Sequence, residues 1–465
     1  MMRRLVVVAP FVLAASLLVG CAPVGPNYAR PQLPSPAQFR FVESPAQAQS
    51  LADAPWFQVF DDPTLQGLIR DAITNNLDLR VAAARVEEAR ARAGIAKSFL
   101  YPQIDGVAGY GIRQASNTSE EDDTTHQNAV YGFRLSWELD LFSRIRREKE
   151  SATALALASE MGRRGVLVTL VGDVATNYFL LRELDLQLSI ARDTLRINDD
   201  TVTYFQNRLD GGVSNRLELD RIQANRERTA ASIPGIERQI AATENLISLL
   251  LGRPPAGITR QPLSPDLVLP PPIPPGLPAS LLERRPDVLQ AEQVLVSANA
   301  DIGAAKALFY PAINLTGFLG GLSGDLNTFL GGDGAVWSLA AGLLQPVYQG
   351  GRIRRNLEAM QARFDAALAQ YQKAALNGYR EVADSLVTIQ KLAETRAHQQ
   401  VGVTALQDAS DLARARYDSG LANYLEILNA DERLFDEQLL LAQTRGAEFR
   451  ARAELYRALG GGWQP

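Results

Sequence analysis

The chain has 465 residues, of which 46% are hydrophobic, and a formal net charge of −5. Such a chain can bury a large core, and its acidic balance argues against a nucleic-acid-binding surface. One cysteine and two histidines exclude an internal disulfide and a cysteine–histidine metal cluster. The sequence also lacks a Ser/His/Asp motif and a phosphate-binding loop, so it predicts no enzymatic activity and no cofactor.

The N-terminal sequence predicts a lipoprotein signal peptide over residues 1–20. Arg3 and Arg4 precede an apolar run that is too short for a stable membrane span, and the run ends in Leu18-Val19-Gly20-Cys21. This pattern resembles the bacterial lipoprotein signal, in which the cysteine receives a covalent lipid and becomes the new N-terminus. Ala22 rather than Asp follows Cys21, which favours sorting to the outer membrane. An ordinary signal peptide with a chance cysteine is the alternative.

Residues 21–63 predict an N-terminal extended arm, because they are rich in proline and alanine and show no periodicity. A lipid on Cys21 would tether this arm to the membrane, and several acyl chains on one cysteine give a stable anchor. Asp61-Asp62-Pro63 then favours the start of a helix. Helices are predicted over residues 64–102, with a break near Asn75-Asn76.

Two Tyr-Pro pairs, Tyr101-Pro102 and Tyr310-Pro311, mark joints at which a helix is predicted to become a strand. The sequence before each pair is rich in alanine with charged residues interspersed, as in a helix. The sequence after each pair alternates apolar and polar residues, which is the period of a strand. Proline cannot continue the helix, so the strand begins there. The two joints indicate an internal duplication.

A β-hairpin is predicted over residues 103–141, and its second strand alternates most clearly. One face is apolar and comprises Tyr131, Phe133, Leu135, Trp137, Leu139 and Leu141. The other face is polar or small and comprises Gly132, Arg134, Ser136, Glu138 and Asp140. This pattern is typical of a membrane β-barrel strand, although a soluble sandwich gives a similar one. The acidic run Glu120-Glu121-Asp122-Asp123 predicts a solvated loop, with divalent-cation binding as the alternative.

A long helical hairpin is predicted over residues 142–252. Its first helix carries an apolar residue at every seventh position, a specific coiled-coil signal formed by Leu167, Val174, Leu181, Leu188, Leu195, Val202 and Leu209. A helix from Ser143 to Leu209 would be roughly 100 Å long at about 1.5 Å per residue. The chain turns at Asp210-Gly211-Gly212-Val213, and a kink or broken turn is predicted at Pro234-Gly235 in the return helix.

The second half repeats this pattern after a proline-rich linker over residues 253–279. Helices are predicted over 280–310, a β-hairpin over 311–348 and a long helical hairpin over 349–460, followed by a short tail. Arg352-Ile353-Arg354-Arg355 repeats Arg144-Ile145-Arg146-Arg147. Repeat 1 therefore covers residues 64–252, and repeat 2 covers residues 280–465.

Four membrane strands per chain predict an oligomer. Barrels begin at about eight strands, so four strands cannot close one. Open sheet edges are not tolerated in lipid, so the strands must pair with those of other copies. Two copies would give the smallest barrel, filled by side chains, whereas three copies would give a dozen strands and room for a channel.

In combination these features resemble the outer-membrane factor family, the TolC-like outer-membrane efflux proteins, in its lipoprotein OprM/NodT-type branch. Besides the two hairpin tips, the resemblance is carried by Cys21-Ala22-Pro23-Val24-Gly25-Pro26-Asn27-Tyr28, by Trp56-Phe57 with Asp61-Asp62-Pro63, and by Leu277-Pro278-Ala279-Ser280-Leu281-Leu282-Glu283-Arg284-Arg285-Pro286-Asp287. It covers essentially the whole mature chain.

The resemblance implies a mainly α protein with a membrane β-barrel. The expected assembly is a homotrimer whose twelve-stranded β-barrel continues into a twelve-helix periplasmic α-barrel with a mixed equatorial belt. The implied function is passive export of small molecules such as drugs, delivered by an inner-membrane efflux pump through a periplasmic adaptor (membrane fusion protein). Metal ions or a secreted polypeptide are alternative cargoes. A non-channel coiled-coil scaffold and a periplasmic hydrolase are the alternative classes. Outer-membrane lipid, and no nucleic acid, is expected as a partner.

The resemblance also assigns roles to the two hairpin tips. The tip residues Gly211, Gly212, Ser419 and Gly420 match positions that contact the adaptor. Residues at the periplasmic aperture, or gate, are expected at Glu218, Glu426, Arg416, Tyr417 and Asn429. Asn429 stands where relatives often have Asp, which puts a second acidic ring in doubt. A local alternative is that Asn215 and Asn423 cap the return helices, with Glu218 and Glu426 completing capping boxes.

Overall fold

The computed structural model describes residues 23–41, 62–114, 125–260, 278–323 and 334–461. The signal peptide, Cys21, the acidic loop and the proline run at 270–275 lie outside these residues. The chain divides into two compact units. Unit 1 comprises Met1–Leu33, Ala84–Glu160 and Gln290–Lys373, and unit 2 comprises Pro34–Ala83, Met161–Leu289 and Ala374–Pro465. Each unit draws on both halves of the sequence.

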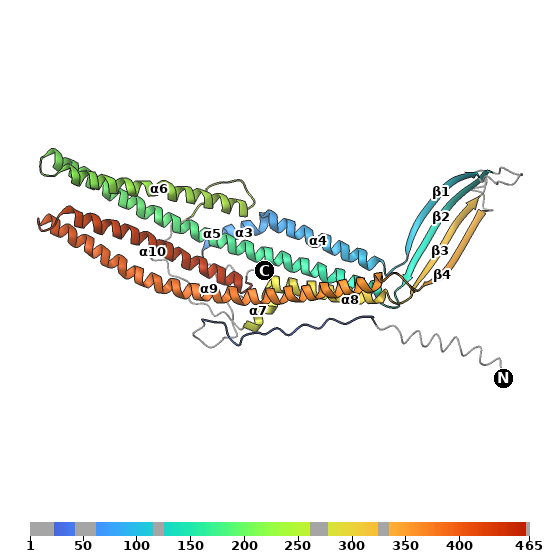
Figure 1. Ribbon diagram of the computed structural model, residues 1–465. Helices are drawn as coiled ribbons and strands as arrows, with labels where there is room; N and C mark the ends of the chain where they lie inside the picture. The colour runs from blue at the N-terminus through green and yellow to red at the C-terminus, as the bar shows by residue number, and fades with distance from the viewer. Residues whose placement is uncertain (1–22, 42–61, 115–124, 261–277, 324–333, 462–465) are drawn as a thin grey trace, which may run out of the picture. The chain divides into compact units, whose positions relative to one another are not determined.

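Unit 1 contains a four-stranded antiparallel sheet in the order β1-β2-β3-β4 (Figure 1). The strands are β1 (Gln103–Gln114), β2 (Thr125–Leu139), β3 (Ala312–Ser323) and β4 (Ala335–Leu344). Each repeat supplies one hairpin, and β2 joins the two hairpins by pairing with β3 from Ala129↔Ser323 to Leu139↔Ile313. The sheet is therefore continuous across the duplication.

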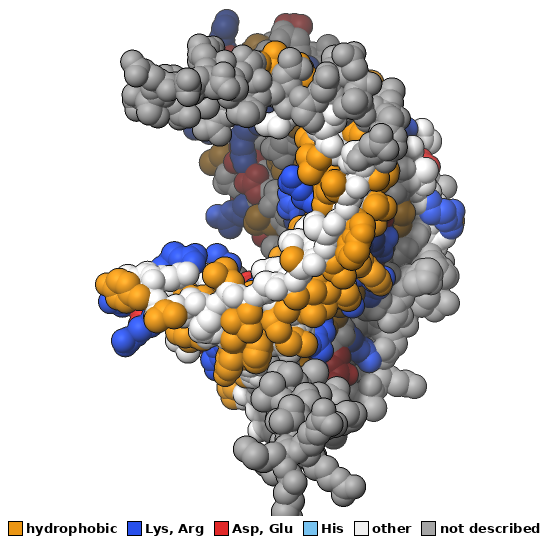
Figure 2. Space-filling model, turned by 90° about the vertical axis from the view of Figure 1, so that its right-hand side faces the viewer, with side chains coloured by type: hydrophobic (Ala, Val, Ile, Leu, Met, Phe, Trp, Pro, Cys, Tyr) orange, Lys and Arg blue, Asp and Glu red, His pale blue; other side chains and the backbone are white. Residues whose placement is uncertain are grey.

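The register of the sheet places apolar residues on one face. Gly106, Phe133, Leu319 and Trp337 lie directly opposite one another across all four strands, and directly paired residues share a face. Phe133, Leu319 and Trp337 are 62%, 65% and 79% exposed. Figure 2 shows hydrophobic side chains gathered along a curved surface of the molecule. The adjacent row, Asp105, Arg134, Phe318 and Ser338, is mainly polar. The alternation predicted for the second strand is confirmed from Tyr131 to Leu139, where β2 ends, whereas Asp140 and Leu141 lie beyond the strand.

Both helix-to-strand joints are closed by a side-chain hydrogen bond from a strand end. The helix before β1 is α4 (Leu77–Ser98), and the helix before β3 is α8 (Pro286–Ala307). Trp137 Nε1 donates to the Leu100 carbonyl at 3.1 Å, and Gln345 Nε2 donates to the Phe309 carbonyl at 3.1 Å. These carbonyls follow the helix ends, where no intrahelical donor is left for them. Tyr101 and Tyr310 are 58% and 44% exposed.

The described part of the N-terminal arm in unit 1 is held by buried polar side chains. Arg147 donates to the carbonyls of Val24 and Gly25 and, at 2.8 Å, to Asn27 Oδ1. Asn299 donates to the Pro26 carbonyl, and Glu292 accepts from Tyr28 and Arg30. The arm sequence quoted above thus has a structural role: it supplies partners to an arginine and a glutamate that are 4% and 8% exposed.

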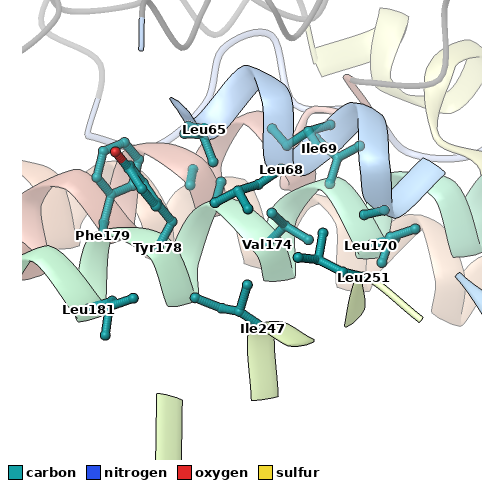
Figure 3. Packing of buried hydrophobic residues seen from close by; sticks show 14 of the residues in the cluster. Leu65, Leu68, Ile69, Leu170, Val174, Tyr178, Phe179, Leu181, Ile247 and Leu251 are labelled. Atoms are coloured by element: carbon teal, nitrogen blue, oxygen red, sulfur yellow. The ribbon is translucent and has the colours of Figure 1, made fainter. Parts of the chain in front are cut away.

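The core of unit 2 forms where α3 (Pro63–Asn75) lies on the middle of α5 (Arg144–Asp210) and against α6 (Arg216–Leu250). Leu65, Ile69, Val174, Leu181 and Ile247 are completely buried in this cluster (Figure 3). Burying a leucine or isoleucine side chain stabilises the fold by about 1.5–3 kcal/mol. The seven-residue period of apolar side chains on α5 therefore corresponds to packing against neighbouring helices.

Asp62 fixes the start of α3 and its position on α5. One carboxylate oxygen accepts from the Thr64 and Leu65 amides at 2.9 and 3.1 Å. The other oxygen accepts from Tyr178 and Arg182, both at 2.8 Å. The predicted helix start is confirmed, and the structure adds the reason why an aspartate stands there.

Among the described residues, α5 is the one helix that is long and apolar enough to cross a membrane by length and composition. Half of its apolar window is buried inside the protein. The seventh-position residues contribute to three successive clusters along α5, which contain Val174 and Leu181, then Leu188, then Val202 and Leu209. The apolar character of α5 is accounted for by this packing.

The return helix α6 is continuous through Pro234, so of the predicted kink or broken turn the broken turn does not occur. A proline inside a helix costs about 3 kcal/mol, because it removes one hydrogen bond and crowds the preceding turn. Its neighbours Ile233 and Ile236 pack into a cluster with Leu184 and Phe435. This packing offsets the cost and keeps the segment helical. Repeat 2 supplies α7 (Pro278–Arg284), α9 (Arg352–Asp418) and α10 (Tyr424–Ala458).

Candidate functional site: the hairpin tips

The two hairpin tips in unit 2 have the same backbone geometry. Gly212 and Gly420 both adopt a φ of +73°. Around Gly212, the Gly212 amide bonds the Leu209 carbonyl and the Val213 amide bonds the Arg208 carbonyl. The same two bonds recur around Gly420, at 2.9 Å each. This is a Schellman turn, whose left-handed residue is normally glycine because a Cβ would be strained there.

Glu218 is held locally at the first tip. Asn215 Oδ1 accepts from the Glu218 amide at 3.0 Å, so the predicted cap at Asn215 is confirmed. The Glu218 carboxylate accepts from Ser214 Oγ at 2.8 Å and not from the Asn215 amide. The hydrogen bond from Ser214 uses one carboxylate oxygen of Glu218. The Glu218 side chain is half-buried.

Glu426 has a different environment at the second tip. The Asn423 side chain makes no cap hydrogen bond, so the predicted cap there is wrong. The Glu426 amide bonds the Asn423 backbone carbonyl at 3.2 Å instead, which satisfies the first turn without the side chain. The Glu426 carboxylate lies 3.4 Å from Arg416 Nε, and both side chains are 49% exposed. An ion pair this exposed contributes about 0–1 kcal/mol.

An aromatic cluster joins the two hairpins just above the tips. Phe205 of α5 contacts Tyr424 of α10 with ring centroids 4.4 Å apart and Tyr417 of α9 at 6.1 Å. Tyr417 and Tyr424 meet edge to face at 5.7 Å. Arg208 lies over the Tyr417 ring at 5.7 Å. Aromatic pairs of this kind contribute about 0.5–1.5 kcal/mol beyond their burial.

Sequence reasoning missed Arg208 and Tyr424 as tip residues. Burial raises the pKa of Tyr424 to about 12, so its hydroxyl stays neutral at all physiological pH values. Tyr424 directly follows the tip turn, and Arg208 stands where repeat 2 has Arg416. Comparing the two tips position by position would have singled out both residues.

A small cavity of 130 Å³ lies between the two tips. It is lined by Asn215, Leu217, Glu218, Arg221, Asn423, Tyr424, Leu425 and Leu428. Leu217 and Leu425 remain 60% and 40% exposed. Asn429 is exposed and lies outside this lining. The tips thus combine one small polar cavity with exposed leucines. Such a surface suits contact with another protein, and its side chains form no catalytic arrangement.

Buried charges connect α5 to α10 further along unit 2. Glu183, 4% exposed, bonds Arg450 and Gln187. A Cβ at Gly446 would collide with Glu183 Oε2, so the two helices meet here in close contact. Burial raises the pKa of Glu183, and the Arg450 charge counteracts part of that effect.

Across the described ranges, no group of three or more His, Cys, Asp or Glu side chains could hold a metal ion. The duplicated helical hairpins, the four-stranded sheet with an apolar face and the paired tips define a channel-forming membrane protein. Comparisons with known proteins agree with this class.

The chain belongs to the outer membrane efflux protein (OEP) family, which matches residues 68–253 and 277–461. It is 34% identical to the cation efflux system protein CusC of Escherichia coli over 457 residues, 98% of each chain. It is 33% identical to the probable efflux pump outer membrane protein TtgC of Pseudomonas putida, over 97% of this chain and 94% of that one. The solved outer-membrane channel OprN has a TM-score of 0.89 and 31% identity, and the match covers 95% of this chain and 100% of OprN.

The protein is therefore an outer-membrane channel of efflux pumps, located in the outer membrane, and not an enzyme. Its duplicated halves and four strands per chain are those of the TolC-like channels, which are trimeric. Relatives in the family serve systems named for metal cations and for drugs or solvents.

Proposed function

We propose that three copies of this chain form the exit duct of a tripartite efflux system. An inner-membrane pump delivers the cargo, a periplasmic adaptor links the pump to the duct, and the duct conducts passively. The observation that supports the trimer is the four-stranded sheet, in which β1 pairs with β2 and β4 pairs with β3. The outer edges of β1 and β4 need strands from other copies, because lipid offers no hydrogen bonds to an open edge.

The strand count supports the trimer over the dimer. Three copies give a twelve-stranded barrel that can enclose an aqueous path, whereas a barrel of about eight strands is filled by its own side chains. The apolar row on one face suits lipid, and the row containing Asp105 and Arg134 suits a wet lumen. The long hairpins would continue this lumen as a twelve-helix tunnel in the periplasm.

We infer that the tips contact the adaptor and form the aperture. Gly211, Gly212, Ser419 and Gly420 are exposed at the ends of the hairpins. Glu218, Glu426, Arg416, Tyr417 and Asn429 would surround the aperture in the trimer. The cargo that we propose is a small organic molecule such as a drug, since TtgC is named for an efflux pump and a further relative for antibiotic efflux. Metal cations are the second candidate, supported by the similarity to CusC.

Trimerisation is tested by native mass measurement of the full chain in mild detergent. We expect three chains per particle, because closing the sheet buries the β1 and β4 edges. A monodisperse monomer that retains the β signal in circular dichroism would contradict the barrel-closure argument.

The cargo is tested by expressing this chain in a strain that lacks its own outer-membrane channel. Restored tolerance of drugs but not of metal cations would favour the first candidate, and the reverse result would favour the second.

Lipidation of Cys21 is tested by mass spectrometry of the mature N-terminus. We expect a lipid-modified cysteine, because the sequence Leu18-Val19-Gly20-Cys21 fits the lipoprotein signal. Cys21→Ala should weaken membrane anchoring but leave the channel able to insert, since the lipid is a tether outside the fold. An unmodified Cys21, or cleavage at another position, would refute this assignment.

A further inference from the structure

A cavity of about 300 Å³ lies in unit 1, where the sheet meets the helices, and we call it the junction cavity. It is lined by Glu138 of β2 and Asn314 of β3, which are directly paired across the two strands. Paired residues share a face, and Glu138 lies four residues after Arg134 of the polar row. The junction cavity therefore lies on the polar face of the sheet, which we assigned to the wet lumen. Its volume suits a small organic molecule.

Part of the cavity wall is apolar and uncovered. Tyr310 and Leu344 line the junction cavity and remain 44% and 66% exposed. Phe142, another lining residue, stacks on Tyr310 with ring centroids 4.7 Å apart. The stack holds the tyrosine ring in place, so this part of the wall is preformed. Such a wall suits the hydrocarbon or aromatic body of a ligand.

The two carboxylates in the cavity wall already have partners. Glu138 accepts from Arg144 Nε at 3.0 Å and from Arg144 Nη2 at 2.7 Å, with one bond to each oxygen. Arg144 also donates to Glu148 at 2.7 Å. Asp140 accepts from two backbone amides at the start of α5, both at 2.9 Å, and from the Arg146 guanidinium. The charges of both wall carboxylates are therefore compensated within the protein.

Arg352 is the charged side chain of the cavity wall for which the described residues supply no ion-pair partner. It repeats Arg144 in the second copy of the Arg-Ile-Arg-Arg sequence and begins α9 as Arg144 begins α5. The two acids that bond Arg144 are replaced by Pro346 and Asn356 in repeat 2. Arg352 instead donates from Nε and Nη2 to Oε1 of the neutral Gln349. The duplication thus keeps the arginine but not its acids.

The geometry of the Arg352 guanidinium leaves one edge available. The bonds to Gln349 use Nε–H and one hydrogen of Nη2, out of five N–H donors. The edge formed by Nη1 and Nη2 can therefore donate two parallel hydrogen bonds to one carboxylate. Arginine favours this bidentate contact with planar anions. An anionic head on Arg352 would place the rest of a ligand along the apolar wall.

We propose that the junction cavity binds small organic anions on the cargo path. The carboxylate of such a molecule pairs with Arg352, and its apolar body lies against Tyr310 and Leu344. Neutral molecules of the same shape bind more weakly, because they lack the charge that the guanidinium needs. The proposal rests on the exit-duct function proposed above and names a class of cargo for it.

The test measures binding of naphthalene-2-carboxylate (2-naphthoate) to the full chain by equilibrium dialysis. The channel is held in nanodiscs of phosphatidylcholine, and empty discs give the background. We expect saturable binding that approaches one 2-naphthoate per chain. The uncharged 2-naphthamide should bind about tenfold more weakly, because hydrogen bonds to charged groups are the stronger ones. Equal affinities for the two probes would contradict the proposal.

Variants of α9 test whether Arg352 holds the anion. Arg352→Gln should lower the affinity for 2-naphthoate about tenfold and leave the binding of 2-naphthamide nearly unchanged. Arg354→Gln is the matched control, because this arginine is 80% exposed, pairs with Glu358 and does not line the cavity. Asn356→Glu restores an acid of repeat 1 and should also weaken 2-naphthoate binding, by occupying Arg352. Asn356→Gln should not weaken it. Native mass and far-UV circular dichroism should stay unchanged in all four variants.

The outcomes separate the cavity from the duct. No saturable binding of 2-naphthoate, or equal affinity of the wild type and Arg352→Gln, would show that the cavity is not an anion site. If discs of phosphatidylglycerol abolish the binding, the cavity holds a lipid headgroup and the proposal is wrong. A trimer that conducts in planar bilayers without binding 2-naphthoate overturns only the cavity proposal. A chain that binds 2-naphthoate but does not conduct overturns the exit duct.

Discussion

Replacing Arg450 by Met should destabilise the helical part of the channel by about 3 kcal/mol at pH 8, and by clearly less at pH 5. Arg450 is the cationic partner of Glu183, whose side chain is only 5% exposed. Removing the arginine leaves a carboxylate buried between α5 and α10 with Gln187 as its remaining polar contact among those described. An uncompensated buried charge is among the most costly single changes in a protein.

The pH dependence follows from the direction of the Glu183 pKa. Burial raises that pKa in the folded protein above its value in the unfolded chain. Such a group adds stability below the unfolded pKa, and this contribution is lost as the pH rises through the folded pKa. Without Arg450 the pKa of Glu183 rises further, so at pH 5 a larger share of the carboxyl is neutral and the unpaired charge is partly relieved.

The measurement is thermal or denaturant unfolding followed by far-UV circular dichroism at both pH values. Adding Glu183→Gln to Arg450→Met should recover part of the lost stability and remove the pH dependence. Arg192→Met is a matched control, because its pair with Glu237 is 60% and 48% exposed and should cost no more than about 1 kcal/mol. Equal losses at pH 5 and pH 8, or a double variant no more stable than Arg450→Met, would count against a buried charge at this position.

Neutralising Glu218 and Glu426 together should reduce the cation preference of the closed channel at low salt. Threefold symmetry would bring three copies of each carboxylate to one narrow opening. The negative charges gathered there would repel anions and attract cations. Gln can still accept the Ser214 hydrogen bond that now goes to Glu218, so the tip should stay folded. The effect should fade in salt, because the Debye length falls from about 10 Å at 0.1 M to about 3 Å at 1 M.

Planar-bilayer recordings measure this selectivity. Glu237→Gln serves as control, since Glu237 is exposed on α6 about five turns from Glu218. A Glu218→Gln, Glu426→Gln channel with wild-type selectivity at low salt would show that these carboxylates only support the local turn structure.

The tip contacts predict a different phenotype from the tip charges. Tyr417→Ala removes the ring that packs on Phe205 and Tyr424, so the tips should close less tightly. We expect the conductance of the channel to rise severalfold while its ion selectivity changes little. Arg416→Ala removes only a half-exposed ion pair and should have a smaller effect. Tyr417→Phe keeps the ring contacts and should open the channel less than Tyr417→Ala. These variants distinguish mechanical closure from charge selection.

The sequence by itself determined the elements of this protein and their duplication. Period-two alternation predicted the apolar face of β2, and the apolar residues at every seventh position of α5 predicted its buried stripe. Both signals depend only on which side of an element avoids water. The break between α3 and α4 at Asn75-Asn76 also depends on neighbouring residues alone. Asn76 Oδ1 accepts from the Leu79 amide at 2.9 Å and caps the start of α4.

Only the tertiary structure decided what covers each face. Periodicity reports that a face is buried but not by which partner, so the pairing of β2 with β3 and the docking of the arm on Arg147 could not be derived from it. Pro234 stays helical because Ile233 and Ile236 are packed by a distant segment. Asn423 makes no side-chain cap, and the Glu426 amide bonds the Asn423 backbone carbonyl instead. For the sheet, the arm and Pro234, contacts between residues far apart in sequence outweighed the local preference.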